Sequence, residues 1–366
     1  MFANRYRGKR VFVTGHTGFK GSWLSEWLIG LGAEVTGFSD IVQPEPCLFR
    51  NLGLAERMHH IIGDVRDAAA VAAAMCAAAP DLVFHLAAQP IVRLSYRQPA
   101  ETFAVNVLGT VNVMEAIRAL PAPPVAVMIT SDKCYENREW VSGYREEDPM
   151  GGHDPYSASK GCAELAISSW NRSFFRTEGS ARIASARAGN VIGGGDWSAD
   201  RIVPDCIRAL LEGREIIVRR PEAVRPWQHV LEPLSGYLLL GAVLSSGGLL
   251  PASAYGIAYN FGPEIHSSRN VAALVSEILK HWPGRWKEVR DPSAPHEAGL
   301  LSLAIDRAVH YLKWRPVWNF ERTVEATAKW YRSVACQGAD AGEHTRADIE
   351  SYCADAQSLG VGWALA

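Results

Sequence analysis

The chain has 366 residues, of which 48% are hydrophobic and 21% charged, with 37 Lys and Arg against 39 Asp and Glu. That length exceeds an ordinary domain of roughly 100–200 residues, so we expect two lobes or one large α/β unit. The near-neutral charge argues against a nucleic-acid-binding protein that relies on a basic face. No apolar run approaches the roughly 20 residues needed to span a membrane, and we expect no signal peptide.

The first 130 residues alternate between short β-branched runs and longer amphipathic or alanine-rich stretches. This alternation predicts a parallel sheet with helices on both faces, which is a doubly wound α/β fold. The expected strands are Arg10–Thr14, Glu34–Phe38, Leu82–Leu86 and Val125–Thr130. The expected helices are Ser22–Gly30, Asp67–Ala79 and Phe103–Leu120.

The pattern changes near residue 193, where a run of three glycines is followed by a stretch rich in Pro and Arg. Further helices are expected over Val271–Lys280 and Glu321–Tyr331. We therefore predict a first domain over residues 1–192, a smaller C-terminal substrate-binding lobe over 193–335, and a C-terminal tail over 336–366. Segments within 228–262 could return to the first domain.

Seven cysteines are scattered along the chain, with no Cys-x-x-Cys pair and no Cys/His cluster. An odd, dispersed set of this kind predicts reduced thiols in the cytoplasm. It predicts neither a disulfide framework nor a metal site.

A glycine-rich loop joins the first expected strand to the first helix. Gly15, Gly18 and Gly21 have the spacing Gly-x-x-Gly-x-x-Gly. Glycine permits a tight turn and close backbone approach, so a pyrophosphate can sit on the amides at the helix N-terminus. The loop, with Thr17 and Phe19, therefore predicts a dinucleotide site in a Rossmann-type domain. Lys20 either joins this site or caps the helix.

An acidic residue that binds the adenosine ribose is expected about 20 residues after such a loop. Asp40 lies 19 residues past Gly21, although the strand alternation places Ser39 at the strand tip. A carboxylate there would favour NAD over NADP, and the preference depends on which of the two residues faces the ribose. Asp64 and Val65 either flank the adenine or are ordinary loop residues.

A candidate catalytic set follows the fourth expected strand. Tyr156 and Lys160 lie four residues apart at the start of a helix, so they share one helix face. Ser131 lies just past the strand that ends at Thr130, and in a parallel sheet that strand end faces the cofactor crevice. Tyr156 could remove a hydroxyl proton while hydride leaves the same carbon, with Lys160 favouring the phenolate and Ser131 holding the developing carbonyl oxygen.

At this point the chain resembles the extended short-chain dehydrogenase/reductase family, from about residue 10 to residue 331. The resemblance implies NAD as the cofactor and a nucleotide diphosphate sugar as the substrate, bound by the second lobe. Beyond the glycine loop and the catalytic set, the matching pieces are His85-Leu86-Ala87-Ala88, Asn106, Asn190, Arg225-Pro226-Trp227 and Tyr259-Asn260-Phe261-Gly262. We expect Leu86, Ala87, Ala88 and Asn106 to contact the cofactor.

The pair Asp132-Lys133 narrows the resemblance. Nucleotide-sugar 4,6-dehydratases carry Asp-Glu there, and the CDP-glucose 4,6-dehydratase subgroup departs from that pattern as this chain does. The resemblance implies oxidation at C4, loss of water across C5 and C6 with Asp132 protonating the departing hydroxyl, and return of hydride to C6. NAD is regenerated, so the enzyme is a lyase. Such enzymes serve deoxysugar biosynthesis, including that of lipopolysaccharide O-antigen.

The substrate side is less clearly marked. Arg201, Arg208, Arg219 and Arg225 are suited to a pyrophosphate, although each is also an ordinary salt-bridge residue. Of the four, Arg225 resembles the family's diphosphate ligand most closely. The other candidate substrate residues are Gln89, Asn190, Asp196, Trp197, Asn260 and His296.

Two other functions share parts of this pattern. A nucleotide-sugar 4-epimerase would need Ser131, Tyr156 and Lys160 but not Asp132 beside an ionisable residue. A non-catalytic NAD sensor would need only the glycines. The helices Phe103–Leu120 and Ser157–Phe175 resemble the pair that forms a homodimer interface in this family, although a neighbouring element of the same chain could also cover them.

Overall fold

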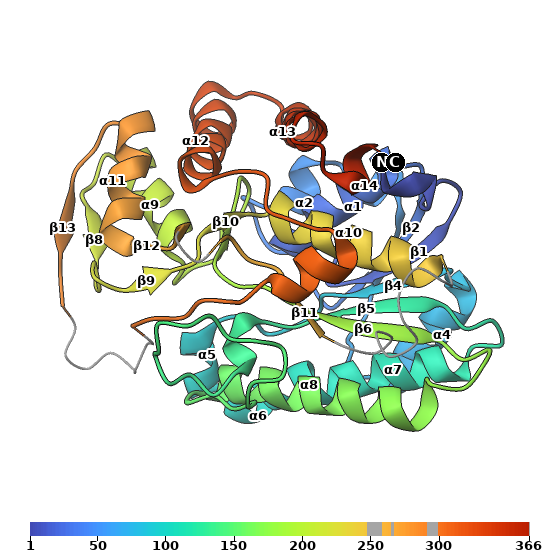
Figure 1. Cartoon of the computed structure of the whole chain (residues 1–366). Coiled ribbons are helices and arrows are strands. Elements are labelled where there is room, and N and C mark those ends of the chain that lie inside the picture. The colour runs from blue at the N-terminus through green and yellow to red at the C-terminus, as the bar shows by residue number, and fades with distance from the viewer. Residues whose placement is uncertain (247–257, 265–266, 291–298, 366) are drawn as a thin grey trace.

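The computed structural model describes residues 1–246, 258–264, 267–290 and 299–365. Its centre is a seven-stranded sheet with the strand order β11-β6-β5-β4-β1-β2-β3, in which every neighbouring pair is parallel (Figure 1). The strands are β1 (Arg10–Thr14), β2 (Glu34–Ser39), β3 (His59–Ile62), β4 (Leu82–His85), β5 (Val125–Ile129), β6 (Arg182–Arg187) and β11 (Ala258–Asn260). The predicted doubly wound α/β fold is confirmed.

Helices cover both faces of the sheet, and each face has its own apolar core. One face carries α4 (Ala68–Ala78), α7 (Gly109–Ala119) and α8 (Pro155–Phe174). The opposite face carries α1 (Phe19–Gly30) and α10 (Leu231–Ser245). The order of the strands reverses between β1 and β4, and ligands bind at such a point beyond the carboxyl ends of the strands.

Part of the chain beyond residue 227 returns to the first domain. The helix α10 packs on β5 and β6, and β11 pairs with β6 at the edge of the sheet. Between the lobes, β10 (Gln228–His229) pairs with β7 (Val191–Ile192). The chain therefore crosses between the two lobes more than once.

The second lobe is built from short strand pairs and two amphipathic helices, on the left of Figure 1. Its strand pairs are β8 (Ile216–Val218) with β13 (Trp286–Glu288), and β9 (Val224–Arg225) with β12 (Arg269–Asn270). Its helices are α9 (Ile202–Leu211) and α11 (Val271–His281), and α12 (Phe320–Tyr331) packs on α11. The Asn270 side chain caps α11 by accepting a hydrogen bond from the Ala273 amide.

The expected helix over Phe103–Leu120 is divided in the structure. The helix α6 (Pro99–Phe103) leads into a π-helical turn, Ala104–Leu108, before α7 begins. Such π turns are rare and often lie at functional sites. The buried residue of this turn is Asn106.

The C-terminal tail that we expected is instead two helices packed on the first domain. These are α13 (Ala341–Ser358) and α14 (Gly362–Leu365), beside the N-terminus in Figure 1. The Trp363 ring stacks on Phe2 with their centroids 4.8 Å apart, and it also contacts Trp27 of α1. The buried stripe of α13 contains Ala, Gly, Thr and Cys beside Ile349 and Tyr352, so its hydrophobic periodicity is weak in the sequence.

The remaining elements are short, and some of them border the cleft described below. They include α2 (Leu48–Asn51), α3 (Leu54–Arg57), α5 (Val92–Arg97) and the short 3-10 or π segments Phe2–Asn4, Asp132–Cys134, Ala308–Leu312 and Arg332–Cys336. All seven cysteines lie in the described ranges and are free thiols. Within those ranges no helix is long and apolar enough to cross a membrane, and no three His, Cys, Asp or Glu side chains are grouped as metal ligands.

Candidate active site

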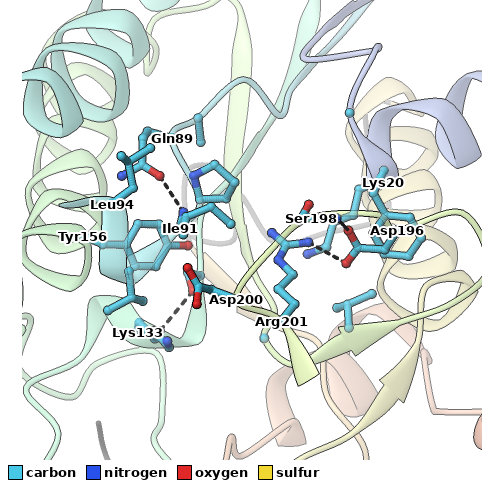
Figure 2. A pocket seen from close by; sticks show the side chains of 18 of the residues that line it. Lys20, Gln89, Ile91, Leu94, Lys133, Tyr156, Asp196, Ser198, Asp200 and Arg201 are labelled. Carbon is cyan, nitrogen blue, oxygen red and sulfur yellow. Dashed lines mark hydrogen bonds and ion pairs between the residues drawn. The ribbon is translucent and has the colours of Figure 1, made fainter. Parts of the chain in front are cut away.

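A cleft of about 1590 Å³ lies at the carboxyl ends of the strands, between the first domain and the second lobe. The glycine loop, the segment after β4, the turn after β5 and the start of α8 line one side. Residues from 188 to 227 contribute the other side. Figure 2 shows Tyr156, Lys133, Lys20 and Arg201 around this cleft.

The glycine loop is packed so closely that Gly15 and Gly21 have no room for side chains. Gly15 has a φ of +74°, and a Cβ on it would lie 2.7 Å from the Ala87 amide nitrogen. A Cβ on Gly21 would lie 2.1 Å from the Gly15 carbonyl oxygen. The first turn of α1 therefore opens directly onto the cleft, with Thr17, Gly18, Phe19 and Lys20 in its lining. This cradle fits the pyrophosphate of a dinucleotide.

The end of β2 separates the two candidate ribose residues. Ser39 is the last residue of the strand and is buried, with its Oγ 3.1 Å from Nδ1 of His16. Asp40 follows it, is exposed, and lines the cleft. Ser39 also lines the cleft, but its hydroxyl is paired with His16, while the exposed Asp40 carboxylate is available to a ligand. Asp64 and Val65 also line the cleft, and hydrogen bonds from Arg66 lower the pKa of Asp64.

This arrangement gives a prediction about cofactor choice. We expect NADP to bind at least about tenfold more weakly than NAD, because Asp40 repels the 2′-phosphate; tenfold is about 1.4 kcal/mol. Asp40→Asn should narrow that ratio, whereas Ser39→Ala should leave it unchanged. Titration calorimetry of both dinucleotides would measure it, and equal affinities in the wild type would exclude Asp40 from the ribose site.

The segment after β4 is held in place by Asn106, a side chain that the sequence analysis expected to contact the cofactor. Leu86, Ala87 and Ala88 line the cleft. Asn106 is 1% exposed and does not line the cleft. Its Oδ1 accepts from the Gln89 amide at 2.9 Å, and its Nδ2 donates to Oγ of Ser159 at 2.9 Å. Asn106 therefore supports the segment from behind, which corrects the expected cofactor contact.

Gln89 lines the cleft, but its side-chain amide is engaged within the same segment. Its Oε1 accepts from the Ile91 amide at 2.6 Å (Figure 2), and its Nε2 donates to Oγ1 of Thr102 at 2.9 Å. These two bonds fix the orientation of the Gln89 side chain and leave one lone pair of Oε1 and one N–H of Nε2 for a ligand.

The catalytic set comes together as its spacing predicted. Asp154 caps α8 by accepting from the Ser157 amide at 2.9 Å, and Pro155 occupies the first turn. Tyr156 then lies in the first turn, with Lys160 one turn later, and both side chains line the cleft. Ser131, just beyond β5, lies within hydrogen-bonding reach of Tyr156.

Burial shifts the pKa values of both titrating groups in this set. It raises the pKa of Tyr156 to about 12, against the opposing hydrogen bond from Ser131. It lowers the pKa of Lys160 to about 8, against the opposing charge of Glu164. At pH 7, which is five units below that pKa, ionising Tyr156 to the phenolate costs about 7 kcal/mol. A cationic ligand beside it would reduce that cost.

Asp132 is held in a defined position beside this set. It is 1% exposed, and its Oδ1 accepts from Oγ of Ser131 at 3.0 Å. Its Oδ2 accepts from Nδ2 of Asn190 at 3.2 Å. A Cβ on Gly189 would lie 1.9 Å from the Asp132 carboxylate, so glycine makes room for it. The Lys133 Nζ lies 5.9 Å from the centroid of the Tyr156 ring.

Five of the expected substrate residues reach the cleft from the second lobe, and Asn190 lines it as well. One of the five, Arg201, is the residue just before α9. Asp196 is buried and accepts from Nη1 of Arg201 at 2.8 Å (Figure 2). Arg219 lies 3.4 Å from Asp200, and Arg225 donates to the Val224 carbonyl oxygen at 2.9 Å. The expected residues in the lining are Asp196, Trp197, Arg201, Arg219 and Arg225.

Two expected substrate residues lie away from the cleft surface. Arg208 lies outside the lining and donates to the carbonyl oxygens of Trp197 and Ser198, so it holds their loop. Asn260 is fully buried, and its Nδ2 donates to two backbone carbonyl oxygens. These two predictions are corrected, because both side chains serve the backbone. His296 lies outside the described residues.

Other cleft residues carried no sequence signal. Residues 44–48, between β2 and α2, line the cleft but match no motif. Arg93, Arg97 and Arg220 add positive charge to the lining. Lys20, which the sequence placed at the glycine loop, also lies near the charges of Arg201, Asp132, Lys160 and Asp196, and burial lowers its pKa to about 8. Only the fold could place Lys20 beside groups from three other segments.

Comparison with known proteins agrees with this geometry. Residues 11–247 match the NAD dependent epimerase/dehydratase family. The chain is 45% identical to a CDP-glucose 4,6-dehydratase of Salmonella typhimurium, over 90% of this chain and 92% of that protein. It is 30% identical to a dTDP-glucose 4,6-dehydratase of Streptomyces antibioticus, over 74% of this chain and 75% of that one.

Solved structures share the fold. A dTDP-glucose 4,6-dehydratase of Streptomyces venezuelae, solved with NAD, superposes with a TM-score of 0.76 at 22% identity, covering 90% of this chain and 98% of that one. A UDP-glucose 4-epimerase of Thermotoga maritima superposes with a TM-score of 0.73 at 20% identity, covering 89% and 99%. The glycine cradle, the Ser131–Tyr156–Lys160 set and the extent of these matches lead to one conclusion: the chain belongs to the NAD dependent epimerase/dehydratase family.

Proposed function

We propose that this protein is a CDP-glucose 4,6-dehydratase, a lyase that converts CDP-D-glucose to CDP-4-keto-6-deoxy-D-glucose and water. The observation that carries the proposal is Asp132, held beside Ser131 and Tyr156 in a cleft of a chain 45% identical to an enzyme of that name. Ser131, Tyr156 and Lys160 alone would serve several reactions of this family.

The residues around the glycine loop fit NAD as the cofactor. Gly15, Gly18 and Gly21 would admit its pyrophosphate, and Asp40 its adenosine ribose. When bound, NAD supplies a reversible hydride acceptor, which takes hydride from C4 of the sugar and returns it to C6. The chain itself moves the protons and positions the sugar.

Each catalytic residue has a separate task in this proposal. Tyr156 accepts the proton of the 4-hydroxyl, and Ser131 donates a hydrogen bond to the 4-keto oxygen. The 4-keto group acidifies the C5 proton. Asp132 then protonates the departing 6-hydroxyl, and as hydride returns to C6 a proton from Tyr156 or from solvent completes C5. Lys133 either removes the C5 proton or stabilises the enolate as a cation while water removes it. Arg201, Arg219 and Arg225 would bind the substrate diphosphate.

A 4-epimerase is the alternative within the family, and one experiment separates the two. Incubation with CDP-glucose deuterated at C4 and with NAD should give a product lighter by one water, with deuterium at C6. Mass spectrometry and NMR would locate the label. An epimerase would give no change of mass. Label lost to solvent would contradict internal hydride return, and the absence of turnover would contradict the proposed activity, as a sensor requires.

We further propose that the protein is a cytoplasmic homodimer that serves deoxysugar biosynthesis, including that of lipopolysaccharide O-antigen. The face of α8 and the π turn before α7 support the dimer, because Leu108, Leu165 and Phe174 are 49%, 59% and 44% exposed. Sedimentation equilibrium at micromolar concentration would test it, and a monomer would leave these side chains in water.

A further inference from the structure

A buried ion pair lies beneath the catalytic turn and takes no part in the chemistry described above. Nη2 of Arg187, on β6, donates to Oε2 of Glu164, on α8, at 2.7 Å. Both side chains are 4% exposed. Taking two charges out of water is costly, and only good geometry and further hydrogen bonds offset that cost. The partners of the pair therefore indicate what it holds.

Those partners bracket the catalytic turn at both ends. Oε1 of Glu164 accepts a hydrogen bond from the hydroxyl of Thr130, the residue before Ser131. Nη1 of Arg187 donates to the hydroxyl of Tyr135 at 2.7 Å, just after the turn. Ser131, Asp132 and Lys133, which all act in the proposed mechanism, lie between these two contacts. One ion pair thus fixes where the turn begins and where it ends.

The same pair joins the turn to the helix that carries the other catalytic groups. Tyr156, Lys160 and Glu164 follow one another at successive turns of α8, so all three share one face. Burial would raise the pKa of Glu164, but Arg187 and the hydrogen bonds from Thr130 and Ser185 lower it overall. Glu164 is therefore ionised at neutral pH.

We propose that Glu164 and Arg187 are positioning residues, forming a clamp that fixes the turn bearing Ser131, Asp132 and Lys133 against Tyr156 and Lys160. This inference rests on the proposed function for its assay. Glu164 has a second effect, because its negative charge keeps Lys160 protonated. The other titratable groups that act on or are acted on by Lys160 are Cys134, Lys20 and His85, with Tyr156 one turn away.

The first test changes the charge of the clamp. Glu164→Gln keeps the size of the side chain but removes the charge that raises the pKa of Lys160. The cation is present below that pKa, which is about 8 in the wild type, and is lost as pH rises through it. We expect the alkaline limb of the kcat/KM profile to move to lower pH by about one unit. Ser185→Ala, which removes a neutral hydrogen bond to the same carboxylate, should leave the limb in place.

The second test keeps every charge and loosens one end of the turn. Tyr135→Phe removes the hydroxyl that joins Arg187 to residue 135, and misplaced catalytic groups commonly cost up to about a hundredfold in rate. We expect kcat for water loss to fall by about tenfold or more, with KM for CDP-glucose within about twofold of the wild type. Tyr259→Phe is the matched control, because the buried Tyr259 hydroxyl has no hydrogen-bond partner among the described residues.

The two variants decide the proposal together. A wild-type pH profile in Glu164→Gln with a wild-type kcat in Tyr135→Phe would overturn the clamp. If Glu164→Gln does not fold, the kcat of Tyr135→Phe relative to Tyr259→Phe decides alone. Failure of the proposed function is a different result, since the wild type itself would then release no water from CDP-glucose.

Discussion

Replacement of Tyr156 by Phe should reduce NADH formation from CDP-glucose by about a thousandfold, within the usual range for the loss of a general base. The phenol is the only part of the side chain that can accept the 4-hydroxyl proton, and without that transfer hydride cannot leave C4. The backbone amide of residue 156 still donates to Oγ of Ser95, so the helix start is retained. Absorbance at 340 nm under single-turnover conditions would measure the step.

The control for this variant is again Tyr259→Phe, which removes a buried phenolic hydroxyl away from the cleft. It should form NADH at the wild-type rate. Both variants should unfold at temperatures close to that of the wild type. Substantial NADH formation by Tyr156→Phe would show that another group accepts the proton, and the catalytic assignment of α8 would be wrong.

Asp132→Asn and Lys133→Ala should block a later step and leave the first one intact. Ser131, Tyr156 and Lys160 remain to support oxidation, whereas protonation of the 6-hydroxyl and loss of the C5 proton are impaired. We expect enzyme-bound NADH to accumulate with a 4-keto hexose that keeps its C6 hydroxyl. Water loss should slow by about a hundredfold, a typical contribution of a positioned acid or base.

Mass analysis of the quenched reaction would separate these variants from Tyr156→Phe, which should give neither NADH nor a keto sugar. Asn fits at position 132, because it has the same size as Asp and Gly189 leaves room for a side chain of that size. Near-normal water loss by Lys133→Ala would show that Lys133 neither removes the C5 proton nor stabilises the enolate. Its charge would then serve only to position the turn. Near-normal water loss by Asp132→Asn would remove the proposed acid.

The sequence predicted those parts of the site whose residues lie close together in the chain or directly follow a strand. The glycine loop lies between one strand and one helix, and Tyr156 and Lys160 lie on a single helix turn. Ser131 was placed by the general rule that strand ends face the crevice. Each of these inferences needs only local geometry, and the structure brings all of these groups to one cleft.

The errors concern residues whose type does not reveal what they bind. An Arg or Asn can bind a ligand or a backbone carbonyl, and residue type does not distinguish the two. Arg208 and Asn260 bind carbonyl oxygens, and Asn106 binds a neighbouring segment. The expected tail was misjudged because α13 buries small and polar residues, which reveal a helix only when its partner surface is known.

The position of α13 and α14 also has a consequence for synthesis of the chain. Trp27 of α1 lies against Tyr352 and Trp363, and Phe2 stacks on Trp363. A ribosome adds Tyr352 and Trp363 long after Trp27, and domains made N-terminal first usually fold as they emerge. This domain is complete only when α13 and α14 have been made, and until then Trp27 lacks these aromatic partners. Nascent chains that stall before about residue 340 would therefore expose Trp27 to chaperones.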